Sequence, residues 1–295
     1  MLGGYVLQNL KGQGVRAICL SRSRPKNLTA DAVWHEFDLT DLQAAGGLGR
    51  LCEDASEIWH VGAMLPGPDV TNQLMFDANV RSVQCLAEFA IKKRLAFRFI
   101  SGATVYANPH AESICEGAAL SPNGFGGFYG STKYLAEEVL EYYSKQGLKV
   151  TILRPSSIYG KGMSSTKLVS RYLSLATANS EITIEPPFDQ SFNLVFASDV
   201  ADLLLSVSQN DSTGIFNIGG FNYSICEIAR ACIDVAASGT ISLNETKKTG
   251  TSPSPKLLFD LDDSKVRGKL GFQKRTSIHM GLSSMVANSE KRGCQ

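Results

Sequence analysis

The chain has 295 residues, of which 43% are hydrophobic and 19% are charged, a balance that excludes disorder and is typical of a chain with a sizeable core. Its 29 Lys and Arg residues and 28 Asp and Glu residues give a net charge of +1, so charge provides no attraction to nucleic acid or to a membrane. No apolar run approaches the roughly 18 residues of a transmembrane helix. The seven cysteines are scattered without a CxxC pair, which favours reduced cytoplasmic thiols over disulfides or a zinc site, and we expect no bound metal.

Short apolar runs alternate with helical patterns in the first half of the chain. Helices are predicted near the start, over 72–93 and over 131–146, where Leu135, Val139 and Leu140 recur on one face and Glu137, Glu138 and Glu141 on the other. The alternation predicts parallel strands joined by crossover helices, which is an α/β, Rossmann-type, doubly wound sheet. The runs that we interpret as buried strands are 15–21, 32–37, 56–62, 97–102 and 149–154.

The alternation loosens after about residue 160. There we expect a helix over 166–176, a strand, turn and strand up to residue 196, a helix over 197–207 with Ser198 as N-cap, a strand over 214–220 and a helix over 224–236. The segment 248–255 reads as a surface loop. We assign residues 1–160 plus 192–236 to a dinucleotide-binding core and residues 161–191 plus 237–295 to a small C-terminal substrate lobe.

The strongest local signal is the sequence Tyr129-Gly130-Ser131-Thr132-Lys133. Residues four apart on a helix share a face, so the Lys133 ammonium can lie near the Tyr129 phenol. A neighbouring cation favours the phenolate and thereby lowers the pKa of a phenol toward the range useful for proton transfer. The pair follows a predicted strand and a Gly-rich loop, which is where ligands bind in open α/β sheets.

Several motifs in order resemble the extended short-chain dehydrogenase/reductases, the NAD(P)-dependent epimerase/dehydratase group. They are His60-Val61-Gly62-Ala63, Asn79-Val80, SGATVYA at 101–107, YGSTK at 129–133, LRPSSIYG at 153–160, ASDVA at 197–201 and FNIGG at 216–220. The resemblance covers nearly the whole chain and implies a nicotinamide cofactor, with Tyr129 as general acid/base and Lys133 as the residue that lowers its pKa and binds the nicotinamide ribose. The other cofactor-binding positions that it implies are Gly3, Asp38, Leu39, Gly62, Ala63, Asn79 and Pro155.

The chain departs from this family at its start. The family's fingerprint TGxxGFIG is matched only from its last glycine, at Leu2-Gly3-Gly4, and the strand before it is missing. Because that strand is central in the family's sheet, we expect an N-terminal truncation, such as a start assigned at an internal Met. The alternative is a divergent short form.

A second departure is Gly102, which stands where the family places a catalytic Ser or Thr. Thr104 and Ser101 are candidates to replace that hydroxyl, and Thr104 is favoured because residues 102 and 104 share a face of a strand. The alternative is that both are ordinary polar residues of a strand.

Two further departures concern the ligands. Ser157 and Phe192 stand where sugar-nucleotide members carry Asn and Arg, which favours a more apolar substrate because a diphosphate needs a guanidinium or its equivalent. The sequence CLSRSRPK offers Arg22, and no acid, after a predicted strand, which favours NADP over NAD.

The sequence predicts an NAD(P)-dependent oxidoreductase or epimerase/dehydratase for a small molecule, with carbonyl reduction slightly preferred. The alternatives are a nucleotide-sugar epimerase/dehydratase, a non-catalytic cofactor-binding protein, and a truncated inactive form. By resemblance a homodimer is possible.

Overall fold

The computed structural model describes residues 1–41, 47–245 and 257–287. The helices are α1 (Leu2–Leu10), α2 (Leu48–Leu51), α3 (Asn72–Phe76), α4 (Ser82–Lys93), α5 (Phe128–Lys145), α6 (Leu168–Thr177), α7 (Ala197–Gln209), α8 (Ile225–Ala236), α9 (Ser264–Leu270) and α10 (Ile278–Val286). The strands are β1 (Ala17–Ser21), β2 (Ala32–Glu36), β3 (Glu57–His60), β4 (Ala96–Ile100), β5 (Val150–Pro155), β6 (Ser157–Tyr159), β7 (Glu181–Ile184), β8 (Ser191–Phe196), β9 (Gly214–Ile218), β10 (Phe221–Ser224), β11 (Thr240–Leu243) and β12 (Leu257–Leu258).

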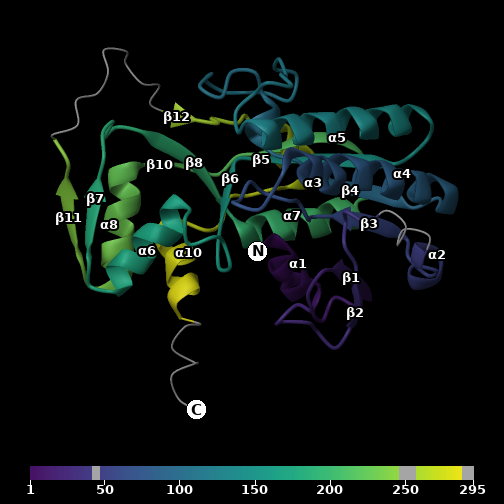
Figure 1. The fold of residues 1–295 in the computed structure, drawn as a ribbon, viewed down its shortest axis with the longest axis horizontal. Coiled ribbons are helices and arrows are strands. Elements are labelled where there is room, and N and C mark those ends of the chain that lie inside the picture. Colours follow the sequence, from purple (N-terminus) through teal and green to yellow (C-terminus); the bar gives the residue numbers. More distant parts are fainter. Residues whose placement is uncertain (42–46, 246–256, 288–295) are drawn as a thin grey trace.

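The predicted α/β fold with parallel strands is confirmed. The strands β3, β4, β5 and β9 form one parallel sheet in that order, and β1 pairs in parallel with β2. Helices α4 and α5 cover one face of the larger sheet, while α1, α7 and α9 pack against its other face. Figure 1 shows the resulting layers, with α4 and α5 on one side of the strands and α7 on the other.

The sheet is divided into two pieces. Among the described residues, β1 pairs only with β2, and β3 pairs only with β4, so each has one edge without a partner strand. Helix α1 connects the pieces, because Leu2, Val6 and Leu10 share one apolar cluster with Ala17 of β1 and Trp59 of β3.

Three local expectations are wrong. The N-cap of α7 is Phe196 rather than Ser198, which lies inside the first turn, because β8 runs directly into the helix. Strand β4 ends at Ile100, and a 3₁₀ turn, η3 (Ala103–Val105), follows, so Thr104 does not lie on a strand and the argument from strand alternation does not apply to it. Glu137 is 4% exposed rather than on a solvated face.

The predicted helix over 72–93 is present but contains a π-helical turn, η2 (Asp77–Arg81), between α3 and α4. The loop predicted at 248–255 lies outside the described residues. In the part of the chain that the structure describes, no helix is long and apolar enough to cross a membrane.

The left part of Figure 1 holds a smaller lobe built on α6, α8, α10, β7 and β11. Its apolar cluster contains Tyr172, Ile182 and Cys232, from α6, β7 and α8. The division into core and lobe stays a prediction, and two elements lie elsewhere than it assigned them. Helix α8 packs against α6 and α10 of the lobe, while α9 packs against β9 and α7 of the core.

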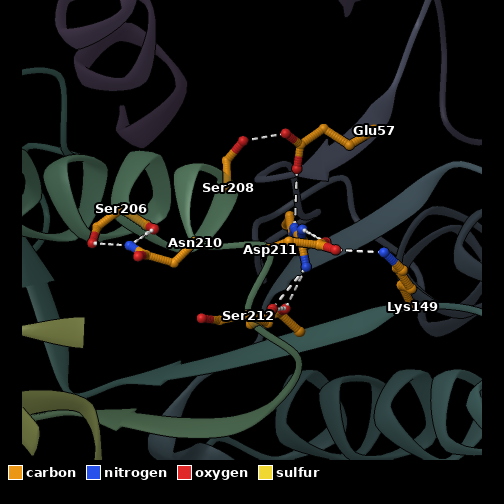
Figure 2. Close-up of polar contacts among 9 residues, drawn as sticks. Glu57, Lys149, Ser206, Ser208, Asn210, Asp211 and Ser212 are labelled. Carbon is orange, nitrogen blue, oxygen red and sulfur yellow. Dashed lines mark hydrogen bonds and ion pairs between the residues drawn. The ribbon is translucent and has the colours of Figure 1, made fainter. Parts of the chain in front are cut away.

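A buried polar cluster connects the amino ends of three strands. Arg98 of β4 is 1% exposed and donates to Glu57 of β3, to Thr151 of β5 and to the carbonyl of Ser212. It also donates to Asp211, which in turn accepts from Lys149. Figure 2 shows Glu57, Lys149 and Asp211 around this centre. The cluster joins the strands to the connection that follows α7, at the edge opposite the carboxyl ends.

Candidate active site

The carboxyl ends of β3, β4 and β5 meet at one edge of the larger sheet, and α5 begins beside them. Strand β3 ends at His60, β4 ends just before Ser101, and β5 ends just before Ser156. Lys133 reaches the same edge from α5, since its Nζ donates to the carbonyl oxygen of Ile100 at 2.8 Å. In parallel sheets this edge is where ligands bind.

Glycines bring the first turn of α5 against this edge. A Cβ atom on Gly130 would lie 2.3 Å from the carbonyl oxygen of Phe125 and 3.3 Å from that of Thr104, so only glycine allows the helix to approach so closely. Gly126 lies between the two candidate catalytic residues, because its Cβ would be 3.5 Å from Thr104 Cγ2 and 3.8 Å from Tyr129 Cδ1. The structure therefore brings Thr104 and Tyr129 together.

Lys133 lies in an apolar and nearly closed environment. Its side chain is 3% exposed, and its Nζ lies 4.6 Å from the centre of the Phe99 ring. Burial lowers the pKa of Lys133 to about 8, against an opposing effect of Glu137. At pH 7 the group remains a cation, and a single hydrogen bond uses only one of its three donors.

The pKa of Tyr129 moves against the expectation. Burial raises it to about 12, and no charge of Lys133 lowers it, since the ammonium is directed to the backbone of β4. Tyr129 therefore keeps its proton near neutral pH, as a proton donor requires. The lowered phenol pKa that the resemblance implies is not present in this structure.

Four side chains at or just after the carboxyl ends of β3, β4 and β5 have buried polar atoms without a hydrogen-bond partner among the described residues. They are His60, with both ring nitrogens, and the hydroxyls of Ser101, Thr104 and Ser156. Burial, followed by the charge of Lys133, lowers the pKa of His60 to about 3, so its ring is neutral. Because unsatisfied buried polar groups are costly and rare in folded proteins, their gathering at one edge indicates a site for a polar ligand. These groups fit a cofactor with a ribose and an amide, which offers several hydrogen-bonding atoms.

The other predicted cofactor-binding residues lie in two loops, in the first turn of α1 and at the end of β5. Leu39, after β2, contacts Gly62, after β3, since a Cβ on Gly62 would lie 3.5 Å from Leu39 Cδ1. Gly3 is in the first turn of α1, where its Cβ would lie 3.7 Å from Val61. Pro155 is the last residue of β5.

The side chain of Asn79 binds the loop that contains Ala63 and does not lie on an open surface. Its Oδ1 accepts from the backbone N–H of Met64 at 2.7 Å, and its Nδ2 donates to the Met64 carbonyl at 2.9 Å and to Thr132 Oγ1 at 3.1 Å. The amide thus ties the Ala63–Met64 backbone to α5, and its effect on a ligand is through that loop.

Arg22 follows β1 and Asp38 lies just after β2. The backbone N–H of Thr40 lowers the pKa of Asp38 below its usual range, and the Thr40 hydroxyl and the Arg22 charge add to this effect. The Asp38 carboxylate is therefore ionised. Its negative charge partly offsets the positive charge of Arg22, the residue that favours NADP in the sequence.

Sequence analysis missed Ser156 and the burial of Glu137. Ser156 follows the Arg154-Pro155 pair and has no pattern of its own. Glu137 continues the spacing of Tyr129 and Lys133 by four residues, and this spacing could have placed it on the same helix face.

The fold and the site define a dinucleotide-binding α/β protein. The chain belongs to the NAD dependent epimerase/dehydratase family, whose sequence model matches residues 1–219. Among curated proteins, it is 24% identical over 203 residues to UDP-glucuronic acid decarboxylase 6 of Arabidopsis thaliana, covering 66% of this chain and 58% of that protein. It is 25% identical over 216 residues to the dTDP-D-glucose 4,6-dehydratase of Homo sapiens, covering 70% of this chain and 60% of that protein. The chain thus spans about three-fifths of the length of these relatives.

Solved structures share the whole fold. A UDP-glucose 4-epimerase from Thermotoga maritima, solved with UDP-glucose, superposes with a TM-score of 0.81 at 19% identity and covers 99% of this chain and 96% of its own. A UDP-glucuronic acid 4-epimerase from Bacillus cereus, in complex with NAD, gives a TM-score of 0.81 at 20% identity. The match covers 99% of this chain and 96% of that chain. The chain has the fold of the NAD-dependent epimerases.

Proposed function

We propose that this chain is an NAD-dependent enzyme that acts at a hydroxyl-bearing carbon of a nucleotide sugar, with Tyr129 as the proton-transfer group. The observation that carries the proposal is the set of unpartnered buried polar groups around Tyr129 and Lys133. The substrate class is supported by the named relatives, which act on UDP- and dTDP-linked sugars.

Each residue at the edge has a role in this proposal. NAD, when bound, supplies the acceptor for a hydride from the substrate carbon. Lys133 donates to the ribose hydroxyls with its unused N–H groups, and Ser156 and His60 contribute to the wall around the cofactor. Thr104 donates a hydrogen bond to a substrate oxygen, in place of the side chain that Gly102 lacks. Tyr129 Oη exchanges a proton with that oxygen.

The structure gives a reason to propose NAD rather than the NADP favoured by Arg22. The ionised Asp38 carboxylate lies in the field of Arg22, so its negative charge partly offsets the cation that would hold a 2′-phosphate. The descriptions of several structural neighbours name NAD.

A second candidate function is the reduction of an apolar carbonyl compound. It is favoured by Phe192, which lies partly buried in the apolar cluster of the lobe beside Tyr223 of β10. A phenylalanine there offers no charge to a diphosphate.

The experiment compares turnover of UDP-glucuronic acid, UDP-glucose and dTDP-glucose with NAD, followed by proton NMR, and of an aromatic ketone with NADPH, followed by absorbance. We expect conversion of a nucleotide sugar, lowered by about 100-fold or more in Tyr129→Phe. Tyr142→Phe is the matched control, because Tyr142 is 60% exposed on the same helix. Conversion of the ketone alone would favour the second function, and equal rates in the two variants would contradict the role of Tyr129.

A further inference from the structure

A buried acid lies one helical turn beyond Lys133. Glu137 follows Lys133 by four residues on α5, and both side chains are buried, at 4% and 3% exposed. Residues at this spacing lie on one helix face, and the Glu137 charge acts on the Lys133 ammonium, although the ammonium itself donates to the Ile100 carbonyl. A buried carboxylate is costly unless a partner stabilises its charge.

Arg154 of β5 is that partner. Its Nε donates to Oε1 and Oε2 of Glu137, both at 3.1 Å, and its Nη2 donates to Oε2 at 2.6 Å. Arg154 is itself 1% exposed. A guanidinium in this geometry holds a carboxylate in a fixed orientation.

The guanidinium is fixed from its other side. Arg154 Nη1 donates to Tyr106 Oη at 3.1 Å and to the carbonyl of Glu116 at 3.2 Å. Tyr106 in turn donates to Asn217 Oδ1 of β9 at 2.5 Å. The Arg154–Glu137 pair is therefore part of a network from three elements and cannot turn away from α5.

The groups around Lys133 show why Glu137 matters for the charge of this lysine. From β3 comes the neutral ring of His60, from β4 the Ile100 carbonyl and the Phe99 ring, and from α5 itself the charge of Glu137, which is paired with Arg154 of β5. Burial favours the neutral amine, and Glu137 is the group that opposes this effect.

We propose that Glu137 is a positioning residue for Lys133, whose carboxylate, held by Arg154, keeps the buried ammonium charged and directed at the edge that carries Tyr129. The proposal deepens the proposed function and rests on it, because a charged Lys133 is what the proposed hydrogen bonds to the ribose require. Without the acid, Lys133 and Arg154 would be two buried cations on neighbouring elements with no anion between them.

The test is an NMR titration of the full chain carrying lysine labelled with ¹⁵N at Nζ, without any cofactor. The Lys133 signal is assigned by its loss in Lys133→Gln. In Glu137→Gln, which preserves the shape, we expect the pKa of Lys133 to fall by about one pH unit or more. Glu137→Asp, which restores the charge, should recover most of the difference.

A double variant, Glu137→Gln with Arg154→Gln, removes both charges of the pair and leaves neither of its two members as an unpaired buried ion, so it keeps the test open if the single variant does not fold. We expect the pKa of Lys133 to fall here also. A pKa of Lys133 equal to that of the unaltered chain in either folded variant overturns the proposal. Because the titration needs no cofactor, its outcome is independent of NAD binding and turnover.

Discussion

Lys133 is the residue on which the chemistry of the site depends most directly. Burial gives it a pKa of about 8, so its charge is present at pH 7 and is lost over the next two pH units. In the proposed function, the proton that it carries is also the donor for a ribose oxygen. Its protonation state therefore couples cofactor binding to pH within an accessible range.

We expect the affinity for NAD to fall as pH rises through about 8, by up to about tenfold for each further pH unit, which is the limit for the loss of one proton. The direction follows from the charge, since the protonated form holds the cofactor. Calorimetric titration between pH 6.5 and 9.5 measures the effect. Lys133→Gln should bind weakly and without this pH dependence; a constant affinity of the unaltered chain up to pH 9.5 would refute the role of the ammonium.

At this scale, sequence reasoning identified residues that carry a motif and missed those defined by their surroundings. Tyr129 and Lys133 were predictable from spacing and context, and the structure places them at the expected edge. The side chains of Ser156 and His60 lack hydrogen-bond partners among the described residues. This could not be predicted, because it depends on every atom around them. Glu137 was assigned to a solvated face because acids on an amphipathic helix usually lie there, and its distant partner Arg154 reverses that preference.

At the scale of elements, the network around Arg98 holds the strands in position from the edge opposite the site. The guanidinium joins β3, β4 and β5 to the connection after α7 (Figure 2). Among the described residues, its acid partners are Glu57, with an 18% exposed side chain, and Asp211, with a 55% exposed one. The arginine, rather than either acid, is the buried member.

Arg98→Ala should lower the free energy of unfolding by about 3–5 kcal/mol, because it leaves buried acceptors without a donor and opens a cavity. Lys149→Ala is the matched control, since Lys149 is 61% exposed and pairs only with the outer acid, and we expect no measurable change. Urea denaturation of both variants gives the comparison. Equal losses of unfolding free energy in the two variants would mean that the cluster acts as a surface ion pair and does not hold the strands together.

The elements themselves were largely predictable, and their boundaries were not. The alternation of apolar runs and helical patterns gave the order of strands and helices because buried parallel strands and amphipathic helices have different periods. The end of β4 was predicted two residues too late, since SGATVY keeps a strand-like composition while its backbone turns into η3. Ser198 was a plausible cap by residue type, but the direct passage of β8 into α7 leaves it inside the helix.

For the whole molecule, the notable feature is a dinucleotide-binding architecture whose sheet is in two pieces. The strands β1 and β2 lie beside α1 and apart from β3, β4 and β5 (Figure 1). Helix α1 spans the division with its apolar face, and the residues expected to hold the cofactor lie on both sides of it, with Asp38 after β2 and Lys133 beside β4. A homodimer and a cytoplasmic location stay predictions.

The measurement that tests the account most directly is calorimetric titration of the full chain with NAD and NADP at pH 7. The account predicts binding of one NAD per chain, tighter than NADP, and at least tenfold weaker in Lys133→Gln. Binding of NAD that is unaffected by this substitution would contradict a site at the carboxyl edge of β3, β4 and β5. Absence of binding for both cofactors would contradict the claim that this chain is an NAD-dependent enzyme.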